Sequence, residues 1–341
     1  MSGRQGMRKP RVVLVGSSKY AVGEYVAEFE KSFDFQIVEA ETRQQAIDKL
    51  HESMDQHGPI QGLVLRKGAA SVLGPIDASL VKPLLPSCRI VASASASFSG
   101  IDVDWMTSNQ VFFCNAPDSE AESVADMAMV LMLSIIRDVS GAEAAIRSGE
   151  WNQRLVPSRD ASAMTLGIVG MGRVGRRLAT KASAFNMRVR YWTQRRLGID
   201  DEASLNAHYM ASLGELLSQS DVVSIHASPS EAVLGRAEFA AMKDGVLFVN
   251  TSSAAAMDIE ALVDALQRGK VLRAGLDVFC GAPETERLAK SGRVLCTPEI
   301  GGETQGAMRR GEKECLENLR EMFKTGRPLA AVNEVVPRQE E

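Results

Sequence analysis

A glycine-rich turn between an apolar run and a helical segment is the feature that most constrains this chain. The run 165–169 (TLGIV) has the composition of a buried strand, and Gly170-Met-Gly172-Arg-Val-Gly175 follows it directly. In a strand–turn–helix setting, Gly170 permits the tight turn, Gly172 lets the backbone approach a pyrophosphate, and Gly175 lets the helix pack closely on the strand. The free N–H groups of the helix N-terminus then favour phosphate. The motif predicts a dinucleotide-binding domain.

The end of the next strand bears on which dinucleotide binds. The segment 191–196 (YWTQRR) contains no acidic residue that could accept hydrogen bonds from ribose hydroxyls, and the first acid after it is Asp200. Thr193, Arg195 and Arg196 instead suit a 2′-phosphate, because arginine binds phosphate oxygens in a bidentate manner and stays charged. The segment favours NADP(H) over NAD(H); a solvated loop is the alternative reading of the two arginines.

Short apolar runs alternate with helical segments along the whole chain. Strands separated by helices imply parallel pairing through crossover connections. We therefore predict an α/β protein with two Rossmann-like, doubly wound parallel-sheet domains and a cleft between them. The expected strands lie at 11–16, 35–39, 62–65, 89–92, 164–169, 187–192, 221–227, 246–250, 273–279 and 293–299, and the final helix at 304–325.

Composition narrows the class of protein. The 341 residues suggest two domains at about 150 residues each, and a net charge of −4 argues against nucleic acid or an anionic membrane surface as the main partner. The longest strongly apolar stretch, 127–136, is too short to span a membrane. The five scattered cysteines show no CxxC spacing, which predicts reduced thiols, a cytoplasmic location and no metal site.

Seven segments, in this order, resemble the D-isomer-specific 2-hydroxyacid dehydrogenase family, which includes glyoxylate/hydroxypyruvate reductases and phosphoglycerate dehydrogenases. The resemblance covers nearly the whole chain. The segments are 123–137 (SVADMAMVLMLSIIR), 165–175 (TLGIVGMGRVG), 220–227 (SDVVSIHA), 242–252 (MKDGVLFVNTS), 258–271 (DIEALVDALQRGKV), 274–279 (AGLDVF) and 297–304 (TPEIGGET).

The resemblance implies interleaved domains. Residues 1–117 plus 305–341 would form a flavodoxin-like substrate domain, and 118–304 an NADP(H)-binding Rossmann domain. Similar proteins are usually homodimers that bury a long helix, which here would be 119–139.

The resemblance also assigns cofactor-side residues. Asp277 would contact the nicotinamide carboxamide, and the backbone of Arg173 and Val174 would hold the pyrophosphate. His226 and Thr251 are further cofactor-binding candidates in the matching segments.

Three side chains on which the family's chemistry depends are missing from the matching positions. Ser253 stands where an arginine binds the substrate carboxylate, and Ala282 where a glutamate raises the basicity of the catalytic histidine. Glu299 stands in place of that histidine, and no histidine follows His226 in the chain. These losses predict that reduction of 2-keto acids is not the activity of this protein.

The substrate side departs from the family as well. Where similar proteins carry a Gly-Ala-Gly run, this chain has Ser95, Ser97, Phe98 and Ser99, which are candidates for substrate contacts. The connection that follows His226 is shorter than usual, which predicts a reshaped cleft on that side.

The substitutions also change the charge of the site. Ser253 for arginine and Glu299 for histidine shift it by about −2 or −3, so that an anion ~4 Å from Glu299 would be opposed by roughly 4 kcal/mol at an effective dielectric constant near 20. A carboxylate substrate is therefore disfavoured. A neutral or cationic small molecule, such as a ketone, an imine or an amine, fits the charge better.

Two classes of function follow. In the first, the chain is an NADPH-dependent reductase or dehydrogenase: Glu299 is the general acid if protonated and steadies an iminium if ionised, Ser253 or a loop serine orients the substrate, and Cys280 is a weaker candidate. In the second, it is a catalytically inactive NADP(H)-binding scaffold or regulatory subunit. A 2-keto acid reductase with relocated catalytic groups is a further alternative. The intact cofactor motifs favour the enzyme.

Overall fold

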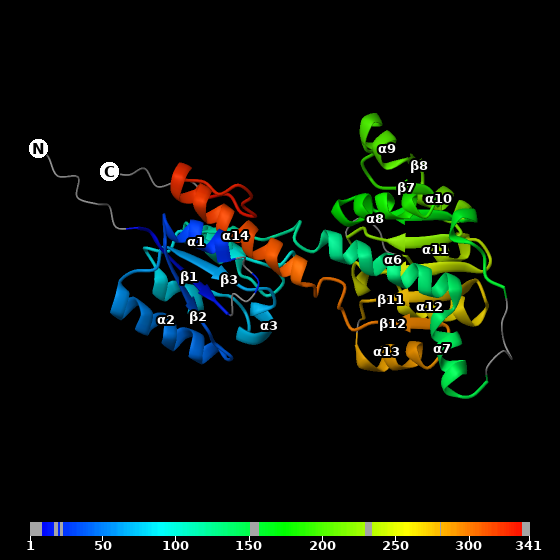
Figure 1. The fold of residues 1–341 in the computed structure, drawn as a ribbon, viewed down its shortest axis with the longest axis horizontal. Helices are drawn as coiled ribbons and strands as arrows, with labels where there is room; N and C mark the ends of the chain where they lie inside the picture. Colours follow the sequence, from blue (N-terminus) through cyan, green and yellow to red (C-terminus); the bar gives the residue numbers. More distant parts are fainter. Residues whose placement is uncertain are drawn as a thin grey trace, which may run out of the picture. The chain divides into compact units, whose positions relative to one another are not determined.

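The chain folds into two units, each built around its own parallel sheet (Figure 1). The computed structural model describes residues 9–16, 20, 23–150, 157–228, 234–279 and 281–335. Unit 1 comprises Met1–Glu120 and Thr304–Glu341, and unit 2 comprises Ala121–Glu303. The predicted fold class, two Rossmann-like α/β domains with parallel sheets, is confirmed.

Unit 1 has a five-stranded sheet in the order β2-β1-β3-β4-β5. Its central strands are continuous apolar runs, such as RVVLV in β1, because helices cover both faces of the sheet. The three-residue strand β5 was not predicted, since so short a run carries no clear periodicity. The strands are β1 (Arg11–Val15), β2 (Asp34–Val38), β3 (Gly62–Leu65), β4 (Ile90–Ser93) and β5 (Phe112–Cys114).

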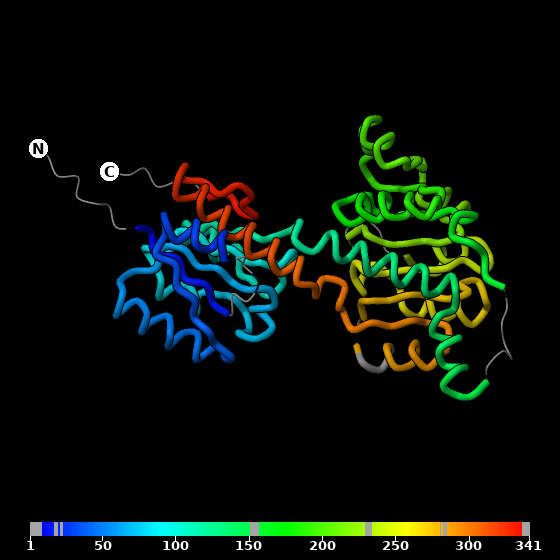
Figure 2. Tube along the Cα trace, in the orientation of Figure 1, coloured from blue at the N-terminus to red at the C-terminus, as the bar shows by residue number. Residues whose placement is uncertain are grey.

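The last helix of the chain, α14 (Gln305–Thr325), belongs to unit 1, and Figure 2 shows its red tube beside the blue N-terminal segments. Two glycines allow its close approach. A Cβ at Gly62 would lie 2.4 Å from Leu319 Cδ2, and one at Gly311 would lie 2.4 Å from the Ala94 carbonyl oxygen. The other helical elements of unit 1 are α1 (Gly23–Glu30), α2 (Arg43–His57), α3 (Ala69–Leu73), α4 (Ala78–Val81), η1 (Lys82–Leu84) and α5 (Val103–Ser108).

Unit 2 has a seven-stranded sheet in the order β12-β11-β10-β9-β6-β7-β8. The sequence predicts six of these strands and misses the three-residue edge strand β8. The strands are β6 (Thr165–Val169), β7 (Arg188–Trp192), β8 (Ala207–Tyr209), β9 (Val222–Ile225), β10 (Val246–Asn250), β11 (Val271–Leu276) and β12 (Val294–Cys296).

The long apolar helix expected at 119–139 is α6, which runs from Ala121 to Arg137, and a second helix, α7, begins at Val139. Asp138 has a φ of 53°, in the left-handed region, and separates α6 from α7. The helix α6 packs on β10 and β11, and Gly275 permits this because a Cβ there would lie 2.9 Å from Leu131 Cβ. The helical elements of unit 2 are α6 (Ala121–Arg137), α7 (Val139–Arg147), η2 (Ala161–Ala163), α8 (Arg173–Ala184), α9 (Ile199–Leu205), α10 (Leu213–Gln219), α11 (Arg236–Ala241), η3 (Ala254–Ala256), α12 (Ile259–Gln267) and α13 (Ala282–Ala289).

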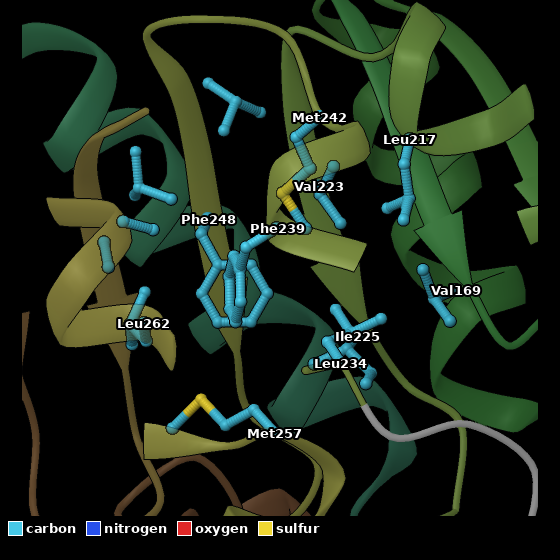
Figure 3. Packing of buried hydrophobic residues seen from close by; sticks show 14 of the residues in the cluster. Val169, Leu217, Val223, Ile225, Leu234, Phe239, Met242, Phe248, Met257 and Leu262 are labelled. Carbon is cyan, nitrogen blue, oxygen red and sulfur yellow. The ribbon is translucent and has the colours of Figure 1, made fainter. Parts of the chain in front are cut away.

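Buried apolar side chains fix the strands of unit 2 on both faces of the sheet. On one face, Phe239 and Phe248 meet edge to face with ring centroids 5.4 Å apart, and Met257 and Leu262 belong to the same cluster (Figure 3). Because interiors of this kind are close-packed, the strand ends that leave this core have little freedom to move. They position the site described next.

Two kinds of feature are absent from the described parts of the chain. No helix there is long and apolar enough to cross a bilayer. No group of three or more His, Cys, Asp or Glu residues is arranged there to hold a metal ion.

Candidate active site

Four candidate residues follow directly on four neighbouring strands of unit 2. The pairings Val169↔Ile225, Asn250↔Ile225 and Asn250↔Leu276 align the carboxyl ends of β6, β9, β10 and β11. The next residue after each strand therefore lies in one row along the edge of the sheet. We call this the carboxyl-edge row; its members are Gly170, His226, Thr251 and Asp277.

The glycine-rich turn has the shape that its sequence predicts. Gly170 has a φ of 95°, and a Cβ there would lie 2.4 Å from the backbone nitrogen of Ala227. At Gly175 a Cβ would lie 2.3 Å from the Gly170 carbonyl oxygen, whereas a Cβ at Gly172 would have no described atom within 4 Å other than those of its chain neighbours. No side chain caps α8, which begins at Arg173. The turn is thus tightly packed behind and open in front, which fits a phosphate group at the helix N-terminus.

Two polar atoms of the row are buried and have no hydrogen-bond partner among the described residues. They are His226 Nδ1 and Thr251 Oγ1. The other ring nitrogen of His226, Nε2, is 2.8 Å from Ser224 Oγ, and burial lowers the pKa of His226 to about 4, so the imidazole is neutral near pH 7. Because buried polar atoms are nearly always paired, this pair of orphans fits a polar ligand lying along the row.

Asp277 uses its carboxylate within the protein. It is 4% exposed and accepts hydrogen bonds from Thr297 Oγ1 at 2.6 Å, the Ile300 N–H at 3.0 Å and the Gly301 N–H at 2.7 Å. Since a carboxylate offers about four acceptor positions, room for one further donor such as a carboxamide N–H is left. Sequence reasoning missed this clamp, because the partners lie 20 to 24 residues further along the chain.

The clamped loop, 297–301, carries Glu299. This residue has a φ of 55°, and its N–H donates to the Thr297 carbonyl at 3.0 Å. Its side chain is exposed and makes no hydrogen bond or ion pair with any residue that the structure describes. A Cβ at position 301 would lie 2.7 Å from Asp277 Oδ2, so only Gly301 lets the loop close on the carboxylate. The backbone at Glu299 is therefore fixed, and no described residue engages its carboxylate.

Ser253 has a local structural role. Its Oγ accepts a hydrogen bond from the Ala255 N–H at 3.2 Å, and its carbonyl accepts one from Asn250 Nδ2 at 2.8 Å. The neighbouring Ser252 was not predicted; its Oγ donates to the Ala227 carbonyl at 2.9 Å and ties the β9 and β10 loops together. The Ser253 hydroxyl hydrogen is left for a ligand. Cys280 and residues 229–233 of the shortened connection 227–239 lie outside the described residues.

The structure separates the two arginines after β7. Arg196 forms a two-point ion pair with Glu202, with Nε–Oε1 and Nη2–Oε2 distances of 2.8 Å each. Arg195 is exposed, and within the described ranges its guanidinium makes no ion pair or hydrogen bond. Thr193 is partly exposed just beyond the strand. Of the three residues predicted to select a 2′-phosphate, Arg196 is already occupied.

The serine-rich loop of unit 1 is held largely by its own hydroxyls. Ser95 Oγ accepts from the Gly68 N–H at 3.3 Å, and Ser97 Oγ accepts from the Ser99 N–H at 3.2 Å. Phe98 is 45% exposed, and its ring meets Phe113 edge-on at 6.3 Å between centroids. The loop therefore presents one exposed aromatic ring together with the hydroxyl hydrogens of its serines.

A glycine-rich turn and a row of polar groups at the carboxyl edge of a doubly wound sheet define a dinucleotide-binding oxidoreductase scaffold. Residues 129–301 match the family model "D-isomer specific 2-hydroxyacid dehydrogenase, NAD binding domain". The chain belongs to this family of oxidoreductases. Its cofactor is a nicotinamide dinucleotide, and its substrate a small molecule.

Named relatives cover almost the whole chain. It is 39% identical to the dehydrogenase efuE of Hormonema carpetanum over 92% of this chain and 79% of that protein. It is 32% identical to 4-methyl-2-oxopentanoate reductase A of Aspergillus oryzae over 95% and 98%.

Solved structures give the same result. A glyoxylate reductase from Paecilomyes thermophila superposes with a TM-score of 0.79 at 30% identity, covering 96% of this chain and 99% of that one. The holo form of D-mandelate dehydrogenase from Rhodotorula graminis superposes with a TM-score of 0.83 at 27% identity, covering 98% and 100%.

Proposed function

We propose that the chain is an NADPH-dependent reductase of a neutral or cationic small molecule, a ketone or an imine, with unit 2 as cofactor domain and unit 1 as substrate domain. The observation that carries the proposal is the Glu299 carboxylate. A clamp of three hydrogen bonds to Asp277 fixes its loop, and no described residue neutralises it.

The roles follow from chemistry. When bound along the carboxyl-edge row, a nicotinamide dinucleotide would supply the hydride for the reduction. Glu299 then acts in one of two ways: protonated, it donates its proton to the oxygen or nitrogen that becomes negative; ionised, it stabilises an iminium cation. The Ser253 hydroxyl orients the substrate.

Charge decides the substrate class. Ser253 brings no positive charge to the position where the family has an arginine, and Glu299 brings a negative one. An anion ~4 Å from an ionised Glu299 is opposed by roughly 4 kcal/mol, whereas an iminium is attracted by about as much.

Cofactor choice rests on the residues around the adenosine ribose. Thr193 and Arg195 lie just beyond the end of β7, where an acidic residue would favour NADH. The Arg195 guanidinium is exposed and has no partner among the described residues, which supports a 2′-phosphate as its partner.

We also propose that the chain forms a homodimer through the surface of α6 and α7. Three large apolar side chains are exposed there: Val130 at 56%, Val139 at 52% and Ile146 at 60%. No residue of α7 is buried, so this helix lacks the packing partner that its apolar face requires. Light scattering on Ile146→Asp should report a monomer.

The function is tested by following NADPH oxidation with a panel of ketones, cyclic imines and 2-keto acids. We expect turnover of a ketone or imine that Glu299→Gln abolishes or reduces by about 10²-fold or more. Glu286→Gln, which breaks a surface ion pair with Lys290, is the matched control and should leave turnover intact.

Two results would overturn the proposal. Tight NADPH binding without turnover of any compound would identify a non-catalytic NADP(H)-binding protein. Efficient reduction of glyoxylate or hydroxypyruvate would identify a 2-keto acid reductase with relocated catalytic groups.

A further inference from the structure

Glu202, on α9, is the centre of a closed group of side chains beside the β7 loop. Its carboxylate accepts a hydrogen bond from Tyr191 OH at 2.5 Å and is bound by Arg196 through Nε and Nη2. Tyr191 OH in turn accepts from the Leu197 N–H at 3.1 Å, and the Arg196 guanidinium lies 5.2 Å from the centre of the Tyr209 ring. One carboxylate thus fixes both the loop and the direction of Arg196.

The two adjacent arginines therefore differ in the charge they can offer a ligand. Arg196 is neutralised by Glu202, whose side chain is only 13% exposed, whereas Arg195 has no partner among the residues the structure describes. The group Arg195–Arg196–Glu202 carries a net charge of +1, against +2 without the glutamate. A 2′-phosphate carries about −2 at neutral pH, so the missing unit of charge bears directly on its binding.

The protonation states of Glu202 and Tyr191 do not change across the physiological pH range. Hydrogen bonding to Arg196 lowers the pKa of Glu202 to about 2. Burial and the Glu202 carboxylate raise the pKa of Tyr191 to about 12. Across the range in which the protein works, Glu202 stays ionised and Tyr191 stays a donor.

We infer that Glu202 sets the strength of cofactor discrimination: by holding Arg196 in an ion pair, it leaves Arg195 alone to read the 2′-phosphate and so weakens the preference for NADPH. Glu202 is a specificity-determining residue that acts through Arg196. The inference rests on the proposed use of NADPH. It extends that proposal, because the residue lies outside every matching motif segment and was not a candidate from the sequence.

The test compares dissociation constants of NADPH and NADH for the full-length protein. Glu202→Gln keeps the size of the side chain and an oxygen for Tyr191 but removes the charge. We expect it to tighten NADPH binding about 3- to 10-fold and to leave NADH within about 2-fold, since NADH has no 2′-phosphate.

A double-mutant cycle assigns the gain to Arg196. Arg196→Met in the Glu202→Gln background should remove the gain, which gives a coupling that independent sites do not show. In the unaltered chain, Arg196→Met should weaken NADPH binding far less than Arg195→Met. Because this contrast leaves Glu202 in place, it tests the inference even if Glu202→Gln folds poorly. Asp244→Asn, which breaks the ion pair with Lys270 before β10, is the control for a general charge effect.

Three results would overturn the inference. Glu202→Gln could weaken both cofactors equally, which is the mark of a purely structural role. It could leave NADPH binding unchanged, or Asp244→Asn could tighten NADPH binding to the same extent. Failure of the proposed cofactor choice is a separate outcome, in which the unaltered chain binds NADH better than NADPH.

Discussion

The glycine-rich turn at 170–175 and the loop at 297–301 lie at the same edge of unit 2 but are built in opposite ways. The turn is shaped by missing side chains: Cβ atoms at Gly170 and Gly175 would collide with backbone atoms. The loop is shaped by one side chain, the buried Asp277 carboxylate, which collects three hydrogen bonds. The turn should therefore respond to added volume, and the loop to lost charge.

The largest effect is expected in the turn. Gly170→Ala places a methyl group 2.4 Å from the Ala227 backbone nitrogen at a φ of 95°, and should lower the free energy of unfolding by about 3 kcal/mol or more. Gly172→Ala, with no described atom within 4 Å other than those of its chain neighbours, should fold normally and lose cofactor affinity instead. Thermal unfolding and NADPH titration of both variants measure the contrast, and equal stability of the two would contradict it.

His226, at a strand end between the turn and the loop, makes the free energy of unfolding depend on pH. The pKa of His226 is lowered to about 4 by burial, below its unfolded value of 6.5, so the neutral ring stabilises the fold above pH 6.5. This contribution, about 3 kcal/mol, is lost as the pH falls from 6.5 to 4, because the unfolded chain takes up the proton first. Urea unfolding at pH 7.5 and 4.5 measures it. In His226→Gln the pH dependence should be smaller by this amount; an unchanged dependence would rule out His226 as its source.

In the loop, Asp277→Asn should act through lost charge at constant volume. The amide NH₂ cannot accept from a backbone N–H, so at least one of the Ile300 and Gly301 donors loses its partner at a cost of about 2 kcal/mol. Turnover should fall by more than the lost stability alone would cause, because the loop that carries Glu299 loses its fixed position. Chemical denaturation and steady-state kinetics measure the two effects. A variant with full activity would show that the clamp does not position Glu299.

The smallest effect has the opposite sign. Glu299 has a φ of 55°, which disfavours side chains with a Cβ, so Glu299→Gly should raise the free energy of unfolding by about 1 kcal/mol. The same change should abolish turnover. Glu299→Gln retains the backbone strain and should leave stability nearly unchanged. If neither variant altered turnover, Glu299 would have no catalytic role.

The contrast between the turn and the loop also separates what the sequence could predict from what it could not. The turn was readable because its determinants lie within six consecutive residues, and the alternating apolar runs gave the two parallel sheets. The Asp277 clamp and the Arg196–Glu202 ion pair were not, because each depends on side chains that only the folded chain brings together. The three-residue edge strands β5 and β8 were missed, whereas β12, equally short, lies within the predicted run 293–299. The sequence does contain a feature that could have indicated that Glu202 lies near the β7 loop: the acidic run that opens α9.

The packing of Gly62 against Leu319 affects the order in which the two units can finish folding during translation. Unit 2 is one continuous stretch of chain. In unit 1, by contrast, the helix that packs on the sheet is synthesised some 200 residues after the strands. During translation, domains generally fold as they emerge from the ribosome. The face of β3 that receives α14 must stay uncovered until residue 319 is made, by which time unit 2 can already have folded. The N-terminal part of this protein is thus the last to finish, and it is the part we expect to depend on chaperones.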